Sequence, residues 1–332
     1  MRENALSKGT RANYAHHLKH WFRFCAITFH DPLDPSYQAI EKFTGYLFCY
    51  TNANGDKSSR ILTALNNHFI EAKIDWYRPK WISYLLKGFR GLKPKKLRPK
   101  RPFCHILIHH FNKHVIKKRD FLHTSIWLGM LFGYFGGMRP GEYSKRKYST
   151  PLTLRQITWN PSADSPREVI ITLKKSKANR FGDKREQITL GCKCGKKRFG
   201  YASPCPVHTL ISFLKRRKKK FGAINLSQPV LVDHKNRILK YDVIRKFIKQ
   251  GIPIVSQATG VALDPKYYTP HSLRHGGCTD LSRLGTASYK VSIFGRWNSD
   301  CWKQIYINID FFDIARLRNT TVDALRNHLW MS

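Results

Sequence analysis

A basic, proline-rich segment divides the chain into two parts with different sequence patterns. Residues 91–102 read G-L-K-P-K-K-L-R-P-K-R-P, with three prolines and six Lys or Arg residues. Because proline lacks a backbone N–H and clashes with the preceding helical turn, this segment is predicted to be extended. We therefore expect an N-terminal domain over residues 1–90, a linker over 91–102 and a second domain over 103–332.

The first 90 residues carry four apolar stripes at helical spacing. Apolar side chains recur three or four residues apart, which places them on one face of a helix. Turn-forming residues at 31–35 and 52–56 separate the first three stretches. We therefore expect a small all-helical domain. The stripes are Tyr14, Leu18, Trp21, Phe22 and Cys25; Ile40, Phe43 and Leu47; Leu62, Leu65 and Phe69; and Ile82, Leu85 and Phe89.

The second domain is predicted to be helical with a small β-sheet. Its most apolar run, residues 121–135, is about fifteen residues long, shorter than the roughly 20 that a membrane span needs. This run is typical of a buried helix. Three short stretches at 154–159, 169–173 and 187–190 have the pattern of strands, and the helical pattern returns from Pro206. The expected fold class is mainly α with a small β-sheet.

The charge of the chain restricts its partners. Sixty Lys and Arg residues against 21 Asp and Glu give a net charge of +39. Such a chain repels itself unless an anionic partner neutralises it, and nucleic acid does so with release of condensed counterions. The basic residues are spread along the whole chain, which disfavours a membrane surface. The basic residues of the linker are compatible with three roles: a solvated connection between domains, a nuclear-localisation signal, or an extended segment that lies on DNA phosphates.

The cysteines and the N-terminus indicate the compartment. Eight cysteines in 332 residues are too few for a disulfide scaffold, and the first ten residues lack the apolar region of a secretory signal. We expect an intracellular, DNA-associated protein with reduced cysteines. These features do not separate the cytosol from the nucleus.

One group of cysteines has the spacing of metal ligands. C-x-C is followed, after ten residues, by C-x-x-H, and three thiolates with an imidazole suit a tetrahedral structural zinc ion. C-x-C is less typical than C-x-x-C, so ordinary loop cysteines are the alternative. A zinc ion here would hold the segment after the last predicted strand and take no part in catalysis. The candidates are Cys192, Cys194, Cys205 and His208.

Six residues suggest chemistry only as an ordered set. Alone, an arginine after an apolar helix is favoured by the helix dipole, and a tyrosine between two isoleucines is usually a core residue. An H-x-x-R pair shares one helix face but occurs by chance in many proteins. The set is Arg139 in G-G-M-R-P-G-E, Lys177 between two predicted strands, His271 and Arg274 in H-S-L-R, Trp297 in F-G-R-W, and Tyr306 nine residues later in K-Q-I-Y.

This ordered set resembles the tyrosine recombinase, or phage-integrase-like, family. The family's pattern is Arg, a hairpin Lys, H-x-x-R, His or Trp, and Tyr, and the resemblance covers nearly the whole chain. It implies a helical, SAM-like core-binding domain followed by an α+β catalytic domain. Two further stretches, K-S-K-A-N and C-P-V-H, resemble the Crypton-like eukaryotic transposon branch, which would imply a nuclear location.

The resemblance implies that DNA is cleaved and rejoined through a 3′-phosphotyrosine, with no cofactor required. Tyr306 would attack phosphorus and His271 would act as the general base. Arg139 and Arg274 would bind the phosphate oxygens as charge develops on them. Lys177 would protonate the leaving 5′-oxygen.

Trp297 and several residues outside the set have supporting or alternative roles. Trp297 would donate its indole N–H beside the scissile phosphate. Glu142 would orient Arg139, or is only a surface charge. His275 would add a phosphate contact, or cap or pack its helix. Lys175 is the first alternative to Lys177, and Lys174 and Lys184 share the same loop.

The expected partners are double-stranded DNA and further copies of the chain. The amphipathic segment 313–330 would dock on a neighbouring protomer and give a dimer to tetramer on DNA. No membrane partner is expected. The alternatives are a type IB topoisomerase-like enzyme, a non-catalytic DNA-binding protein derived from a recombinase, and a basic structural or RNA-binding protein.

Overall fold

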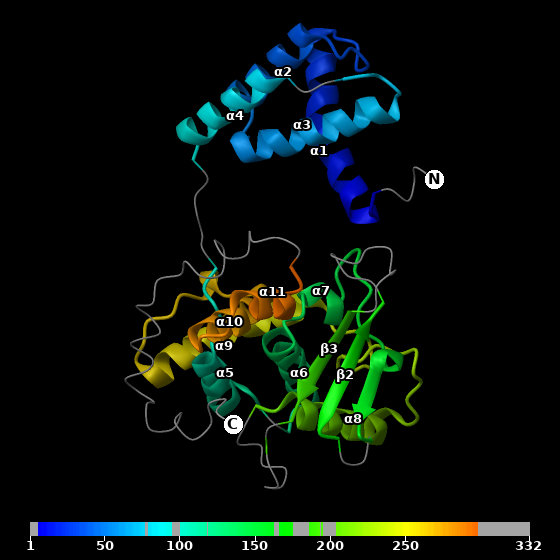
Figure 1. The fold of residues 1–332 in the computed structure, drawn as a ribbon, viewed down its shortest axis with the longest axis vertical. Coiled ribbons are helices and arrows are strands. Elements are labelled where there is room, and N and C mark those ends of the chain that lie inside the picture. Colours follow the sequence, from blue (N-terminus) through cyan, green and yellow to red (C-terminus); the bar gives the residue numbers. More distant parts are fainter. Residues whose placement is uncertain are drawn as a thin grey trace. The chain divides into compact units, whose positions relative to one another are not determined.

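A computed structural model of the chain describes residues 6–76, 79–94, 100–117, 119–162, 166–174, 186–192, 194 and 204–297. The chain divides into two compact units, residues 1–98 and 99–332 (Figure 1). The fold is mainly helical with one small antiparallel sheet, which confirms the fold class expected from the sequence.

The first unit is built from four described helices around one apolar core. Ser7, Ser36 and Asn54 begin the first three helices, and each side chain accepts a backbone N–H of the first turn. The indole ring of Trp21 packs edge-on against Phe43, with 4.9 Å between ring centres. The helices are α1 (Lys8–Thr28), α2 (Tyr37–Cys49), α3 (Gly55–Glu71) and α4 (Lys80–Leu92).

For two residues of the apolar stripes, the prediction that they face the core was wrong. Phe22 is 43% exposed, whereas Phe24 is 3% exposed and lies in the core. Phe22 follows Trp21 directly and therefore lies about 100° around the helix axis from that core residue. Leu85 is 38% exposed, and Leu86 takes its place in the core at 2% exposure. A spacing of three or four does not decide which of two adjacent apolar residues faces inward.

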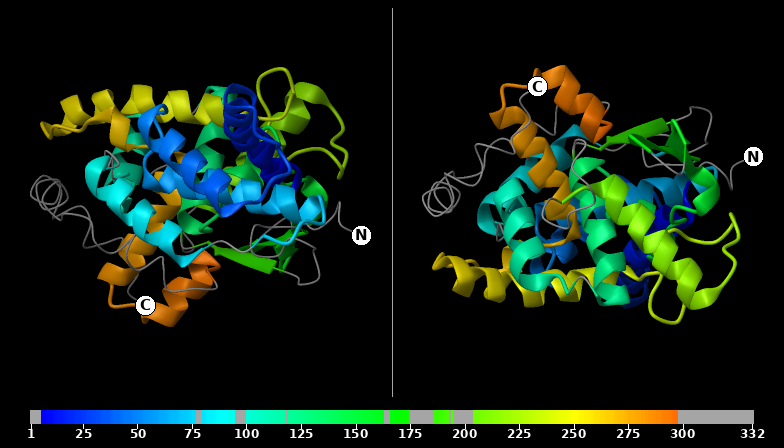
Figure 2. Two further views of the ribbon diagram at one scale, coloured as in Figure 1. Left: turned by 90° about the horizontal axis from the view of Figure 1, so that it is seen from above. Right: turned by 90° about the horizontal axis from the view of Figure 1, so that it is seen from below.

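The second unit surrounds a central apolar helix, α6. Residues 124–134 of this helix are all buried, because α8, α9 and α10 pack against it. α9 lies along one side of the unit in both views of Figure 2. Among the described helices, none is both long and apolar enough to span a membrane. The α-helices are α5 (His105–His110), α6 (Phe121–Phe135), α7 (Pro140–Tyr143), α8 (Pro206–Phe221), α9 (Tyr241–Thr259), α10 (Pro270–Arg283) and α11 (Ser288–Gly295), with a π-helical turn at Phe111–Val115 and 3₁₀ turns at Leu154–Gln156 and Pro265–Tyr267.

The sheet contains β1 (Ile157–Asn160), β2 (Glu168–Leu173) and β3 (Glu186–Gly191) in sequence order, all antiparallel. Ile171 pairs with Ile188, and Val169 pairs with Leu190. Alternate side chains of β2 and β3 are buried on one face, as a half-covered antiparallel sheet requires. Ile188 and Leu190 reach Gly136 at the end of α6, so the sheet adjoins the turn that leads to α7.

Candidate active site

Arg139 lies at the turn that connects α6 to α7. Gly137 has a left-handed backbone, with φ of +54°, which glycine adopts without a side-chain clash. Arg139 then caps α7, with Pro140 at the first helical position, where no intrahelical N–H bond is lost. The Glu142 carboxylate accepts the backbone N–H of Arg139 at 2.7 Å and pairs with its guanidinium at 3.2 Å. The local sequence therefore holds the Arg139 side chain in place with 19% exposure.

α10 carries His271 and Arg274, three residues apart on one face. Pro270 is the first residue of this helix, so His271 lies in its first turn. The Arg274 side chain is buried, and its Nη1 donates a hydrogen bond to the Gly137 carbonyl at 2.9 Å. Its Nη2 donates to the Gly295 carbonyl. Arg274 thus joins α10 both to the turn that holds Arg139 and to the end of α11.

Trp297 follows α11 and lies against Arg274. The guanidinium carbon of Arg274 is 4.8 Å from the centre of the Trp297 ring, which is a cation–π contact. The backbone N–H of Trp297 donates to the Ser292 carbonyl at 3.1 Å, and the Ser292 hydroxyl donates back to the Trp297 carbonyl at 3.1 Å. These bonds close the chain back onto α11 and hold the indole ring beside Arg274.

A third arginine, Arg296, completes a buried cluster of ion pairs. It pairs with Glu142 at 2.6 Å and with Glu186 of β3 at 3.1 Å, and its side chain is only 10% exposed. Together with Arg139, these residues form what we call the ion-pair cluster, which connects α7, β3 and the end of α11. Sequence reasoning missed Arg296 and Glu186. The F-G-R-W motif showed a basic residue, but its partners lie 154 and 110 residues away along the chain.

The electrostatic environment of His271 is strongly positive. Burial is the largest cause that lowers its pKa from 6.5 to about 4, and neighbouring positive charges act in the same direction. A neutral imidazole can accept a proton at neutral pH. Cations gathered at one place are typical of a site that binds an anionic group such as phosphate. The charges that act on His271 are those of Lys100, Arg146, Arg274 and Arg139.

We expect the His271 imidazole in the free protein to titrate with a midpoint near pH 4. The folded pKa of about 4 lies below the ordinary value of 6.5. Between these values the unfolded state binds more protons, so His271 favours folding fully above about pH 6.5 and progressively less as the pH falls. NMR titration would measure the midpoint, with the signal assigned by its loss in His271→Asn. A midpoint at or above the ordinary value would contradict this account.

The structure brings together four of the six residues of the ordered set: Arg139, His271, Arg274 and Trp297. His275, also on α10, is buried, with 4% exposure. Lys174, next after β2, is exposed. The predicted residues that lie outside the described part of the chain are Lys177 and Tyr306, the alternatives Lys175 and Lys184, and the segment 313–330.

A second group of polar side chains lies at the opposite end of β3. Cys192 and Cys194 follow the strand, and Cys205 and His208 lie at the start of α8. One ligand atom from each comes within 4.8 Å of all the others. The four zinc candidates therefore come together as a group that could hold a metal ion.

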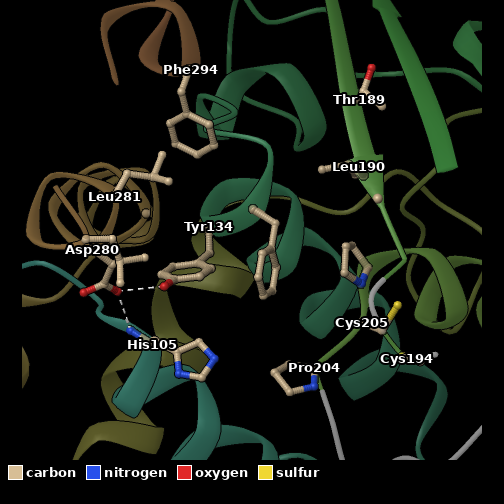
Figure 3. A pocket seen from close by; sticks show the side chains of 15 residues that line it. His105, Tyr134, Thr189, Leu190, Cys194, Pro204, Cys205, Asp280, Leu281 and Phe294 are labelled. Atoms are coloured by element: carbon tan, nitrogen blue, oxygen red, sulfur yellow. Dashed lines mark hydrogen bonds between the residues drawn. The ribbon is translucent and has the colours of Figure 1, made fainter. Parts of the chain in front are cut away.

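A cavity of about 300 Å³ borders this group (Figure 3). Cys194 and Cys205 lie on one side of it, and Leu281 and Phe294 lie on the other. The Tyr134 hydroxyl donates to the Asp280 carboxylate at 2.7 Å, which anchors that wall. None of the residues that line the cavity is His271 or one of the four cations that act on it.

No protein-family model matches the sequence, and no curated protein matches it. Solved structures do match. The Tn1549 transposon integrase in complex with transposon right end DNA is 13% identical, with a TM-score of 0.54 over 93% of this chain and 98% of that one. The XerH site-specific recombinase in its post-cleavage complex with palindromic difH is 13% identical, with a TM-score of 0.56 over 92% and 78%. A lambda integrase dimer bound to a COC′ core site is 14% identical, with a TM-score of 0.53 over 91% and 89%. Over nearly its whole length, the chain therefore has the fold of site-specific recombinases and integrases.

Proposed function

We propose that this chain is a site-specific tyrosine recombinase that cleaves and rejoins DNA. The observation that carries the proposal is the convergence of Arg139, His271 and Arg274, from two separate elements, in a cation-rich site. Trp297 joins them from a third element. A chance H-x-x-R would have no reason to lie beside a distant arginine and tryptophan that complete the family's pattern. The fold shared with integrases and recombinases supports the same reaction.

In the proposed reaction, Tyr306 is the nucleophile. Its phenolic oxygen forms a bond to phosphorus while the bond between phosphorus and the 5′-oxygen breaks, which leaves a 3′-phosphotyrosine and a 5′-hydroxyl. His271, neutral at physiological pH, accepts the phenolic proton. Lys177 gives a proton to the departing 5′-oxygen. A 5′-hydroxyl of a second strand then reverses these steps and releases the tyrosine.

The two arginines of the site stabilise the phosphate as negative charge grows on its oxygens. Arg139 is the more accessible, and Glu142 holds its guanidinium in place. Arg274 is buried, with its Nη2 on the Gly295 carbonyl. In the proposed DNA complex, Nη2 exchanges this carbonyl for a phosphate oxygen, so the bond between Arg274 and the last residue of α11 is lost when DNA binds. Trp297, beside Arg274, then offers its indole N–H to the same phosphate.

The proposal assigns a role to each part of the chain. Residues 1–90 are the core-binding domain, 91–102 the basic linker and 103–332 the catalytic domain. A net charge of +39 favours contact with DNA phosphates along the whole chain. The segment 313–330 links protomers into a dimer to tetramer on DNA. The K-S-K-A-N and C-P-V-H stretches support the Crypton-like branch, and thus a nuclear protein that mobilises or integrates a DNA element.

Trapping of a covalent adduct tests this function. The purified full chain is mixed with DNA that carries a nick near the candidate cleavage point, so that a short fragment diffuses away and religation stops. A protein–DNA band on a denaturing gel, with the nucleotide mapped to Tyr306 by mass spectrometry, is the expected result. An adduct on another residue would contradict the proposal that Tyr306 is the nucleophile.

Two other outcomes would identify the alternatives. Tight DNA binding without an adduct on a randomised library of sites would favour a non-catalytic DNA-binding protein. Relaxation of supercoiled DNA without exchange of strands between two sites would favour a type IB topoisomerase-like enzyme.

A further inference from the structure

We propose that Cys192, Cys194, Cys205 and His208 form a structural zinc site, which we call the Cys₃His site. Its ligands come from the segment after β3 and from the first turn of α8. The proposal does not depend on the reaction assigned to the chain, because the Cys₃His site is separate from the residues around His271.

Two distances within the group are close to those between ligands of one tetrahedral ion. The Sγ atoms of Cys192 and Cys205 are 3.8 Å apart, and Cys192 Sγ is 3.7 Å from His208 Nδ1. Bonds of about 2.3 Å to sulfur and about 2.0 Å to nitrogen, at tetrahedral angles, place two sulfurs about 3.8 Å apart and a sulfur and a nitrogen about 3.5 Å apart. A disulfide would need about 2.05 Å between the sulfurs. The cysteines of the group are not in disulfides.

The chemistry and burial of the donors favour zinc. Three thiolates and one neutral imidazole are a ligand set found in closed structural zinc sites, and hard cations such as Mg²⁺ prefer oxygen. Cys205 is 6% exposed, and Cys192, Cys194 and His208 are partly buried. Without an ion, several weakly hydrogen-bonding thiols would be brought together at one half-buried place for no evident gain. The ion with three thiolates carries one negative charge, which the strongly basic chain favours.

The position of the Cys₃His site indicates what the ion does. Cys192 comes directly after β3, whose other end carries Glu186 of the ion-pair cluster. Cys205 caps α8, and α8 packs against both β3 and the central helix α6. The ion therefore fastens the end of β3 to the start of α8 and forms part of the wall of the cavity in Figure 3. It stabilises the second unit and touches no residue of the cation-rich site.

Metal content tests the proposal directly. The full chain, purified without added metal or chelator, is expected to contain about one zinc ion per chain by elemental mass spectrometry. His208→Ala and Cys194→Ser are expected to lose most of the zinc and to unfold at a lower temperature. His208→Cys restores a fourth ligand and is expected to retain the zinc. The matched controls, Cys49→Ser and His234→Ala, change exposed residues outside the group and are expected to keep the wild-type content.

A spectroscopic readout keeps the test valid if a variant fails to fold. Wild-type protein reconstituted with Co²⁺ is expected to show thiolate-to-cobalt charge transfer and the intense visible bands of tetrahedral coordination. Octahedral bands without charge transfer, zinc content unchanged in His208→Ala and Cys194→Ser, or a disulfide between Cys192 and Cys205 in freshly purified protein would each overturn the proposal.

Discussion

The Arg139→Lys variant is expected to cleave DNA about 10²- to 10³-fold more slowly than the wild type, at similar affinity for DNA. Lysine keeps the positive charge that pairs with Glu142, so the fold and the attraction for phosphate persist. It cannot present the planar fork that binds two phosphate oxygens as charge develops on them. The loss should therefore fall on the chemical step. Single-turnover formation of the covalent adduct measures the rate, and fluorescence anisotropy measures binding.

Arg146→Lys is the matched control for this substitution. Arg146 is exposed, its charge also lowers the pKa of His271, and its guanidinium stacks on the Tyr241 ring at 4.3 Å. The same change of side chain there should leave the rate nearly unaltered. Equal losses at both positions would mean that any guanidinium near the site matters equally. An unchanged rate in Arg139→Lys would contradict the proposed phosphate clamp.

The elements that could be predicted are those whose signals lie close together in the sequence. Residues 121–135 are apolar on all sides, and a helix of this kind must be buried on all sides, as α6 is. β2 and β3 follow from alternation within six residues. The strand predicted over 154–159 was wrong at its start, because Leu154–Gln156 forms a 3₁₀ turn and β1 begins at Ile157. The choice between Leu85 and Leu86 was not predictable, because it depends on the rotation of α4 against its neighbours. That rotation is decided by packing between distant segments.

In the candidate site, the residues of the ordered set could be predicted from the sequence, whereas the contacts that hold them could not. Arg139, His271, Arg274 and Trp297 could be named because a family pattern orders them along the chain. The contacts that hold them could not, since backbone groups make many of them. The Gly137 carbonyl accepts from Arg274 at 2.9 Å and from Arg296 at 3.3 Å, and no side-chain motif marks a carbonyl. The four zinc candidates were the easier case, because their spacing alone suggested a shared ion.

Within the ion-pair cluster, Glu142 is a buried carboxylate that pairs with two arginines, Arg139 and Arg296. Glu142→Gln is expected to lower the free energy of unfolding by about 3 kcal/mol, because a buried cation that loses its partner is left without compensation. The estimate is at the low end for a broken buried pair, because Arg296 keeps Glu186 at 3.1 Å. For a unit of this size the melting temperature would fall by roughly 6–12 °C. Scanning calorimetry of the full chain would measure it.

An exposed ion pair in the same unit provides a control, because its loss removes a charge without affecting a buried partner. Asp242 pairs with Arg245 at 3.1 Å, with the two side chains 78% and 48% exposed. Asp242→Asn should therefore change the free energy of unfolding by less than about 1 kcal/mol, since solvent screens the pair. The double variant Glu142→Gln with Arg296→Gln should be more stable than the sum of the two single losses, because no uncompensated charge remains at that contact. Strict additivity of the two losses would mean that Glu142 acts through Arg139 and the cap of α7 rather than through Arg296.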